Sequence, residues 1–276
     1  MNRRAFLARA AAVAAAARAI ADPLGLPIGC QTYPVRDTIG KDFDGTLKEL
    51  ASAGFQTIEM CSPPGYVSSG YGPLVGMKAA EMRKHIEDAG LHCPSCHYGF
   101  KELKENLDDR IAFAKELGLR QMVLSSFGLP KDAAMEDWTR AAAQLNEIGE
   151  RTQTAGLQLG YHNHDGEFHE IDRNLVYDAL MRTFDPKMVK MQFQTSVVSL
   201  GFQAATYFRK YPGRFLSIHV ADWSPTEKKQ VAVGQGVIDW KQLFAAAKTG
   251  GVRNYFVEMN LDLMRPSVPY LKKLST

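Results

Sequence analysis

The segment GLQLGYHNHDGEF, residues 156–168, decides the fold of this chain. Leu157, Leu159 and Tyr161 alternate with more polar residues, the pattern of a short strand that ends in HNH, residues 162–164. Residues two apart in a strand point to the same face, so both imidazoles are expected to project together from its carboxyl end. Neutral imidazole binds divalent metals, although two such histidines could equally form a hydrogen-bonded polar cluster.

The same strand pattern recurs along the chain, and helical patterns lie between its occurrences. Eight strands are predicted, over residues 26–31, 57–61, 91–97, 121–126, 157–162, 188–194, 215–220 and 255–258. Four predicted helices stop directly before a glycine, a common helix end signal, and cover residues 43–53, 78–89, 103–117 and 134–155. The later helices are predicted over residues 174–183, 202–211, 239–248 and 263–274.

Eight strands that alternate with helices predict an α/β protein with a single (β/α)8 TIM barrel over residues 22–276. An open doubly wound sheet is the alternative, but it usually carries a glycine-rich phosphate turn after its first strand. Here that turn reads QTYPVRD, residues 31–37, which favours the barrel. Its active site is then expected at the carboxyl ends of the strands.

The composition is that of a globular protein with a nearly balanced surface charge. The chain has 276 residues, 45% of them hydrophobic, and a formal net charge of +3. Lysine and arginine are interleaved with acidic residues outside the N-terminus, so no nucleic-acid-binding stripe is predicted.

The N-terminus, residues 1–21, is predicted to be a twin-arginine signal peptide. Arg3 and Arg4 precede an alanine-rich stretch and the cleavage-type sequence AIA, residues 19–21. This predicts export to the periplasm and a mature start near Asp22, and the apolar stretch is too short to span a bilayer. No later segment is apolar enough to be transmembrane, so no membrane association is expected after the signal is removed.

The four cysteines carry little functional signal. Cys93 and Cys96 have the spacing of a redox or zinc half-site, but no second such pair completes a structural zinc site. They stand in a predicted strand and not at a helix start, where a reactive thiolate would be stabilised. Buried thiols, or one incidental disulfide, are expected.

Polar side chains gather at the predicted strand ends. A ring of such groups is costly to bury unless partners or a metal satisfy them. In chain order the ring comprises Gln31, Tyr33, Glu59, His97, Ser125, Ser126, His162, His164, Gln192, Gln194, His219, Asp222, Glu258 and Asn260.

With these strand ends the chain resembles the xylose-isomerase-like TIM barrels, the sugar phosphate isomerases and epimerases. The resemblance covers almost the whole mature chain. It rests on the motifs IGCQTYPVRD (28–37), GFQTIEM (54–60), LGYHNHDGEF (159–168), FLSIHVADW (215–223), VGQGVIDW (233–240) and NYFVEMN (254–260).

The resemblance implies one divalent metal, manganese or zinc, held by side chains on strands five to eight. Carried over, the ligands are His162 or His164, then Gln194, His219 and Glu258. Gln194 is a departure, because relatives often have an aspartate there. An amide oxygen can bind a cation but carries no charge, so the site is expected to bind metal more weakly or to favour zinc.

The implied chemistry is proton transfer beside the carbonyl of a sugar, through an enediolate that the metal stabilises. Glu258, Glu59 and His97 are the candidate acid–base groups. The candidate substrate-binding residues are Gln31, Tyr33, Asp222 and Trp223. Predicted export points to a non-phosphorylated small-molecule sugar, keto-sugar or glycoside as the partner, acted on by an isomerase or epimerase.

Three alternatives stay open at the level of sequence. The same metal site would serve a lyase or hydratase acting on 3-keto-glycosides, which would explain a missing second glutamate. A non-catalytic carbohydrate-binding barrel is the second alternative. An abasic-site endonuclease on the same barrel would need more acids and a basic groove, and is disfavoured. The sequence does not indicate an oligomeric state.

Overall fold

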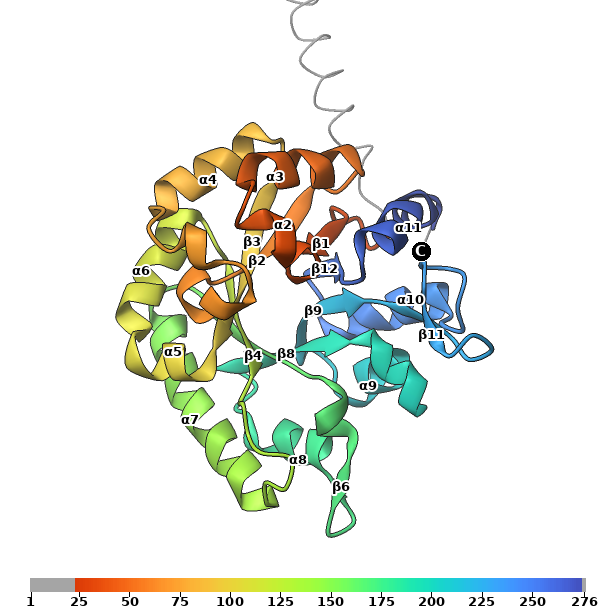
Figure 1. Ribbon diagram of the computed structural model, residues 1–276. Coiled ribbons are helices and arrows are strands. Elements are labelled where there is room, and N and C mark those ends of the chain that lie inside the picture. The colour runs from red at the N-terminus through yellow and green to blue at the C-terminus, as the bar shows by residue number, and fades with distance from the viewer. Residues whose placement is uncertain (1–22, 275–276) are drawn as a thin grey trace, which may run out of the picture.

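Eight parallel strands close into a barrel, as the alternating pattern predicts (Figure 1). The computed structural model describes residues 23–274. Going round the barrel from β1, the strand order is β1-β12-β9-β8-β5-β4-β3-β2. The bounds in chain order are β1 Gly29–Gln31, β2 Thr57–Cys61, β3 His92–Gly99, β4 Gln121–Ser126, β5 Gln158–His162, β8 Val189–Gln194, β9 Phe215–Val220 and β12 Asn254–Val257.

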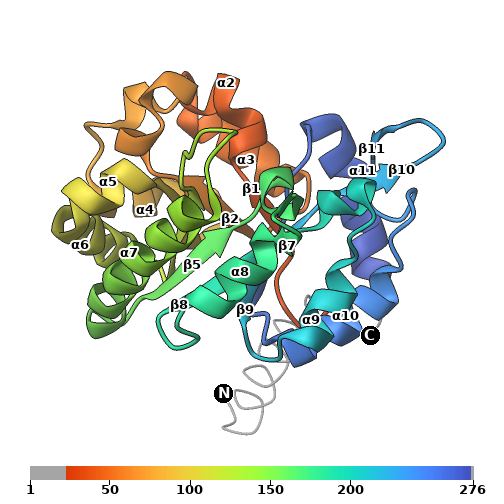
Figure 2. The same cartoon turned by 90° about the horizontal axis from the view of Figure 1, so that it is seen from below.

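Helices surround the barrel, and Figure 2 shows them from a second direction. Because each helix returns the chain to the start of a parallel strand, the loops after the strands all lie at one end of the barrel. The helices are α2 Arg36–Ile39, α3 Phe43–Ser52, α4 Ala79–Asp88, α5 Phe100–Glu105, α6 Leu107–Leu117, α7 Met135–Thr154, α8 Val176–Thr183, α9 Ala204–Lys210, α10 Trp240–Gly250 and α11 Leu261–Lys273.

The glycine stop signals work through backbone conformation. Gly118 caps α6 with a φ of 90°, and Gly54 follows α3 with a φ of 99°. Such left-handed conformations favour glycine because it lacks a Cβ atom.

Two predicted helices differ from the structure. The helix expected over 103–117 is broken at Asn106 into α5 and α6. The helix expected from residue 174 begins at Val176, because residues 174–175 pair instead with residues 170–171 as the hairpin β6–β7. Its turn residues Asp172 and Arg173 have positive φ angles of 50° and 63°, a conformation typical of two-residue hairpins.

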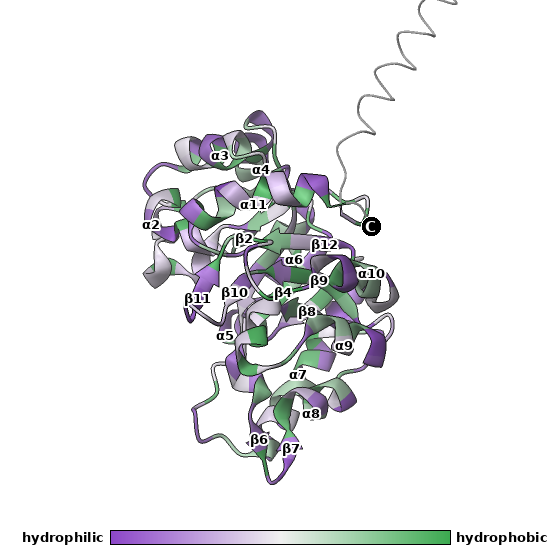
Figure 3. Ribbon diagram, turned by 90° about the vertical axis from the view of Figure 1, so that its right-hand side faces the viewer, coloured by the Kyte–Doolittle hydropathy of each residue, from purple (hydrophilic) through white to green (hydrophobic). Residues whose placement is uncertain are grey.

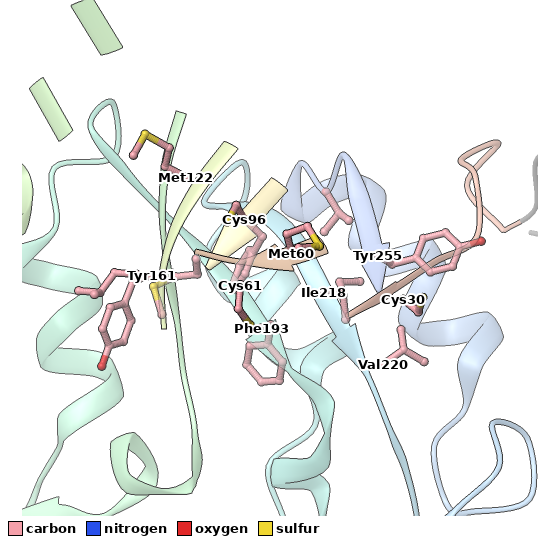
Figure 4. Close-up of a cluster of buried hydrophobic side chains, with 14 of the residues drawn as sticks. Cys30, Met60, Cys61, Cys96, Met122, Tyr161, Phe193, Ile218, Val220 and Tyr255 are labelled. Atoms are coloured by element: carbon pink, nitrogen blue, oxygen red, sulfur yellow. The ribbon is translucent and has the colours of Figure 1, made fainter. Parts of the chain in front are cut away.

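The apolar core lies between the barrel and the helices. Figure 3 shows many hydrophobic residues, coloured green, on the central strands. Figure 4 labels a cluster of buried side chains there, which includes Met60, Phe193 and Ile218. Phe193 is fully buried among aromatic rings of the helix layer, including Phe208 at 5.7 Å between ring centroids. Burying one such side chain stabilises a protein by about 1.5–3 kcal/mol.

The sequence also led to predictions about the cysteines, membrane spans and the signal peptide. All four cysteines are buried free thiols, so no disulfide forms. Within residues 23–274, no helix is both long and apolar enough to cross a membrane. The predicted signal peptide, residues 1–21, lies outside the described residues, and export stays a prediction.

Candidate active site and metal centre

Polar side chains meet inside the barrel. Glu59 on β2 contacts His219 on β9, although these two strands are not neighbours in the barrel. The interior of a TIM barrel is usually packed with branched apolar side chains. Here it holds charged groups, which are stable in that place only because they bond one another.

The Glu59 carboxylate is the centre of this network. It is fully buried, and its two oxygens accept four hydrogen bonds. The donors are Gln31 Nε2 at 2.7 Å, Ser95 Oγ at 2.5 Å, Gln192 Nε2 at 2.8 Å and His219 Nε2 at 2.5 Å. Burial alone would raise the pKa of this carboxyl, but its interactions with His97 and His219 outweigh burial and hold the pKa far below its ordinary value.

His219 bridges two carboxylates. Its Nε2 contacts Glu59, and its Nδ1 lies 2.9 Å from Glu258 Oε2. Burial would lower the pKa of this imidazole, but Glu258 and Glu59 raise it to about 10. His219 is therefore an imidazolium at neutral pH, and it donates one hydrogen bond to each carboxylate.

Glu258 is the carboxylate that reaches the surface of the site. Its side chain is 19% exposed, whereas that of Glu59 is fully buried. Its Oε2 also accepts a 2.5 Å hydrogen bond from Gln194 Nε2. Among residues 23–274 its hydrogen-bond partners all bond Oε2, which leaves Oε1 able to accept a hydrogen bond or a proton. Burial would raise the Glu258 pKa, but the His219 charge lowers it overall.

His162 lies beside this cluster. It is 1% exposed, and both of its ring nitrogens lack a hydrogen-bond partner within the described chain. Its ring centroid is 4.3 Å from that of His219 and 5.1 Å from that of His97. Burial first, and then the neighbouring His219 charge, keep its pKa well below the ordinary value. A buried imidazole with two free nitrogens is costly unless it has a ligand.

A metal ion fits this arrangement. Ligand atoms of His97, His162 and His219 all lie within 4.8 Å of one another, and all three residues are buried. Three imidazoles with an adjoining carboxylate are a donor set that suits zinc and related divalent ions. His219 would have to release one proton and one carboxylate contact to bind the ion, because both of its nitrogens are engaged.

This triad differs from the ligand set carried over by resemblance. His162 and His219 belong to both sets, whereas His97 on β3 was not among the ligands expected from the resemblance. Gln194 turns its amide nitrogen toward Glu258, while its Oε1 accepts a bond from the backbone N of Ser196 at 3.4 Å. The amide thus serves as a hydrogen-bond donor, and its predicted role as a metal ligand stays a prediction.

His164 lies at the mouth of the site. Its ring centroid is 4.6 Å from that of His162, and the residue is exposed. Burial, against an opposing effect of Glu258, lowers the pKa of this imidazole. A neutral imidazole beside Glu258 can accept or return a proton.

Two predicted substrate residues come from the first strand and the loop after it. Gln31 is fully buried and donates to Glu59, while its Oε1 accepts from Tyr33 N at 3.1 Å. Tyr33 is partly exposed, with the Arg36 guanidinium 4.5 Å above its ring. Both polar ends of the Gln31 side chain are therefore used inside the protein. The Tyr33 ring packs against Tyr66 and Arg36.

The other two come from the loop after β9, and Asp222 anchors that loop. Its oxygens accept from backbone nitrogens of residues 223, 234, 236 and 238, and from Trp240 Nε1 at 2.9 Å. A Cβ atom on Gly236 would come within 2.1 Å of Asp222 Oδ1. The VGQGVIDW motif therefore wraps a buried carboxylate, which does not favour the predicted substrate contact for Asp222. Trp223 is partly exposed.

Sequence reasoning also missed part of the network. Ser95 and Ser217 hold Glu59 and Gln192 in place, the latter through a 2.8 Å bond between Ser217 Oγ and Gln192 Nε2. His97 Nε2 lies 2.6 Å from Gln192 Oε1. The available signal was strand alternation, since each serine stands two residues before a site histidine.

Comparison with known proteins places this arrangement in a family. The family model of the xylose isomerase-like TIM barrel matches residues 47–272. The chain belongs to this family. The resemblance expected from the sequence motifs is thereby confirmed.

Curated relatives are named inosose dehydratases. One from Lacticaseibacillus casei is 26% identical over 140 residues, which cover 44% of this chain and 46% of that protein. The match thus spans about half the length of that relative. Another, from Geobacillus thermodenitrificans, is 23% identical over 84% of this chain and 86% of its own length.

Solved structures share the fold. A sugar phosphate isomerase/epimerase from Parabacteroides distasonis superposes with a TM-score of 0.71 at 24% identity, over 89% of this chain and 93% of that one. A protein named IolI, solved with a bound zinc atom, has a TM-score of 0.65 at 13% identity, over 90% and 96% of the two chains.

Proposed function

We propose that this chain is a metal-dependent enzyme that removes the proton beside the carbonyl of a non-phosphorylated sugar or keto-sugar, giving an enediolate. The observation that carries the proposal is the free Oε1 of Glu258 at the mouth of a buried cluster of imidazoles. A carboxylate next to concentrated positive charge can take a proton where negative charge develops on the substrate.

We assign proton transfer to the side chains that are open to a substrate, and positioning to the side chains that hold them. Glu258 Oε1 takes the proton, while Gln194 and His219 hold Oε2 and fix the carboxylate in one orientation. The neutral His164 imidazole is placed to return a proton from a second position. If the proton returns to the neighbouring carbon, the reaction is an isomerisation. If it returns to the opposite face of the same carbon, the reaction is an epimerisation.

His97, His162 and His219 would hold the divalent ion, either manganese or zinc. When bound, this ion supplies charge stabilisation to the enediolate. Such help is needed because a carboxylate with a lowered pKa, such as Glu258, is a weak base.

A lyase acting on 3-keto-glycosides is the second candidate, and the saturation of Glu59 favours it. Four donors occupy that carboxylate, so only one glutamate faces a substrate, whereas elimination needs only one base. The proton leaves C2, its electron pair forms the C1=C2 double bond, and the C1–O bond breaks. The departing oxygen takes a proton, so no oxidant or reductant is needed. Relatives named dehydratases support this outcome.

The substrate is proposed to be a free sugar or glycoside because export to the periplasm is predicted from residues 1–21. Phosphorylated sugars are cytosolic metabolites, and an exported enzyme would meet free saccharides.

The test is solvent exchange with a 3-keto-glucoside in deuterated buffer containing zinc or manganese. We expect deuterium to enter beside the carbonyl, seen by NMR, and mass spectrometry to separate a new ketose from a released aglycone. Glu258→Gln should lower exchange by about 10²–10⁴-fold. If the metal-loaded protein shows no exchange and no release, the proposal is overturned. The carbohydrate-binding barrel then becomes the better explanation.

The matched control is Glu87→Gln on α4, where the carboxylate is exposed and pairs with Arg83. The same chemical change there should leave exchange unaltered. Equal losses in both variants would show that Glu258 has no special role.

A further inference from the structure

A groove opens at the end of the barrel that also holds the candidate active site. It has a volume of about 720 Å³ and runs between the loops that follow β2, β3 and β4. Its lining includes Gly65, Gly99, Phe100, Glu102 and Phe127. Because Gly99 lies two residues beyond His97 on β3, the groove begins at the same end of the barrel as the imidazole cluster.

One wall of the groove is aromatic. The rings of Phe100 and Phe127 meet edge to face with centroids 5.1 Å apart. The Lys104 ammonium lies 4.5 Å from the centre of the Phe100 ring. Phe127 is buried and stacks on Tyr161, so the half-buried Phe100 ring is the part of this wall that offers apolar surface to a flat ring.

Charged side chains line another part of the same groove. Glu102 is 9% exposed and accepts from Ser62 Oγ and from the backbone N of Gly99. Arg110 Nη1 lies 3.4 Å from Glu102, while Arg110 Nε is buried without a hydrogen-bond partner among the described residues. A carboxylate and a guanidinium together accept from and donate to hydroxyl groups.

Charge in the groove is balanced. Lys101 and Arg110 face Glu102 and Glu105, so the lining has no excess of positive charge that would select a phosphate. An aromatic wall with one buried donor–acceptor pair suits a ring that is apolar on its faces and bears hydroxyl groups at its edge.

We propose that this groove binds the second ring of a glycoside, an aryl or sugar ring joined to the sugar that reacts beneath Glu258. The assignment rests on the proposed function, because that function supplies the first sugar at the barrel mouth. It narrows the substrate class from sugars in general to glycosides with a ring-bearing leaving group.

Gly99→Leu tests the proposal by filling the groove. Gly99 has a φ of −82°, and a Cβ atom there would meet only Glu102 Cβ, at 4.0 Å. The leucine side chain therefore enters the groove without backbone strain. Gly76→Leu is the matched control, because a Cβ atom at Gly76 meets nothing within 4 Å and Gly76 lies outside this groove.

The measurement is the ratio of dissociation constants for glucose and phenyl β-glucoside, determined by ligand-observed NMR on the metal-loaded protein. We expect the wild type to bind the phenyl glycoside about tenfold more tightly, as a stacked ring would provide. Gly99→Leu should bring that ratio close to one, and Gly76→Leu should leave it unchanged. Cellobiose in place of the phenyl glycoside distinguishes a sugar ring from an aryl ring.

A ratio near one in the wild type, or an equal ratio in wild type and Gly99→Leu, would overturn the assignment. Should Gly99→Leu fold poorly, Phe100→Leu is the second variant, because it removes only the aromatic ring. It is expected to lower the ratio at least threefold, which corresponds to about half of the binding free energy that stacking provides. Deuterium exchange is read separately. A protein with the expected ratio but no exchange would retain the groove assignment and refute the proposed reaction.

Discussion

The two faces of the barrel strands differ sharply in chemistry. Met60 packs in the apolar layer, while the adjacent Glu59 accepts four hydrogen bonds inside the barrel. Phe193 packs among aromatic rings, while Gln192 bonds Glu59 and Ser217. One residue of spacing thus separates the packing that stabilises the fold from the network that builds the site.

The difference matters because the two faces respond to change by different rules. An apolar layer tolerates exchange between side chains of similar volume. A buried polar network does not, since removing one member leaves its partners unpaired. The following predictions probe each face, from the largest expected effect to the smallest.

Phe193→Ala should cause the largest loss of stability. It removes a fully buried ring from the outer layer, so we expect about 3–5 kcal/mol less unfolding free energy in urea. Activity per folded molecule should stay within about twofold of wild type. A large loss of activity with wild-type stability would show that the two faces are not separable.

Glu59→Gln, a change on the inner face of the barrel, should lower the free energy of unfolding by about 2 kcal/mol. The amide cannot compensate the charge of His219, and it cannot accept all four donors. In urea unfolding with a chelator present, the double variant Glu59→Gln/His219→Gln should recover at least about 1 kcal/mol of the summed single losses. Strict additivity would contradict the bridging role of His219.

His162→Leu should stabilise the metal-free protein by about 1 kcal/mol. It removes two buried nitrogens that have no partner within the described chain. The same change should abolish tight zinc binding, measured by equilibrium dialysis, because one of three ligands is lost. His85→Leu on α4 is the control, and should leave zinc binding intact. Destabilisation of the metal-free form by His162→Leu would show that these nitrogens are satisfied.

Glu102→Gln should alter how stability depends on pH. Burial, against the opposing bonds from Ser62 and Arg110, raises the pKa of Glu102 in the folded state above its unfolded value. The folded wild type therefore loses stability as pH rises from the unfolded pKa through the folded pKa. The variant lacks this loss, so its unfolding free energy relative to wild type should be higher at pH 7.5 than at pH 4. An equal difference at both pH values would contradict the shift.

Strand positions were predictable from the sequence because period-two alternation and glycine stops are local signals. The predicted strands 57–61, 121–126 and 215–220 agree with the structure residue for residue. The hairpin over residues 170–175 was not predicted, since Asp172-Arg173 lacks the glycine that usually indicates such a turn.

The candidate site was only partly predictable for a similar reason. The predicted strand ends placed Glu59, His97 and His219 in one polar ring, but the sequence cannot say which of them meet across the barrel. Asp222 shows the limit most clearly. It stands at a strand end like a substrate ligand, yet it bonds a loop that begins eleven residues later.

The sequence by itself determined the barrel and the ring of polar residues at its strand ends, because these follow from local periodicity and parallel connection. Only the tertiary structure decided that Glu59 is enclosed, that Glu258 is open and that three histidines from separate strands share one centre. Those assignments depend on distances across the barrel, and such distances are fixed by closure of the sheet and not by any neighbouring residues in the chain.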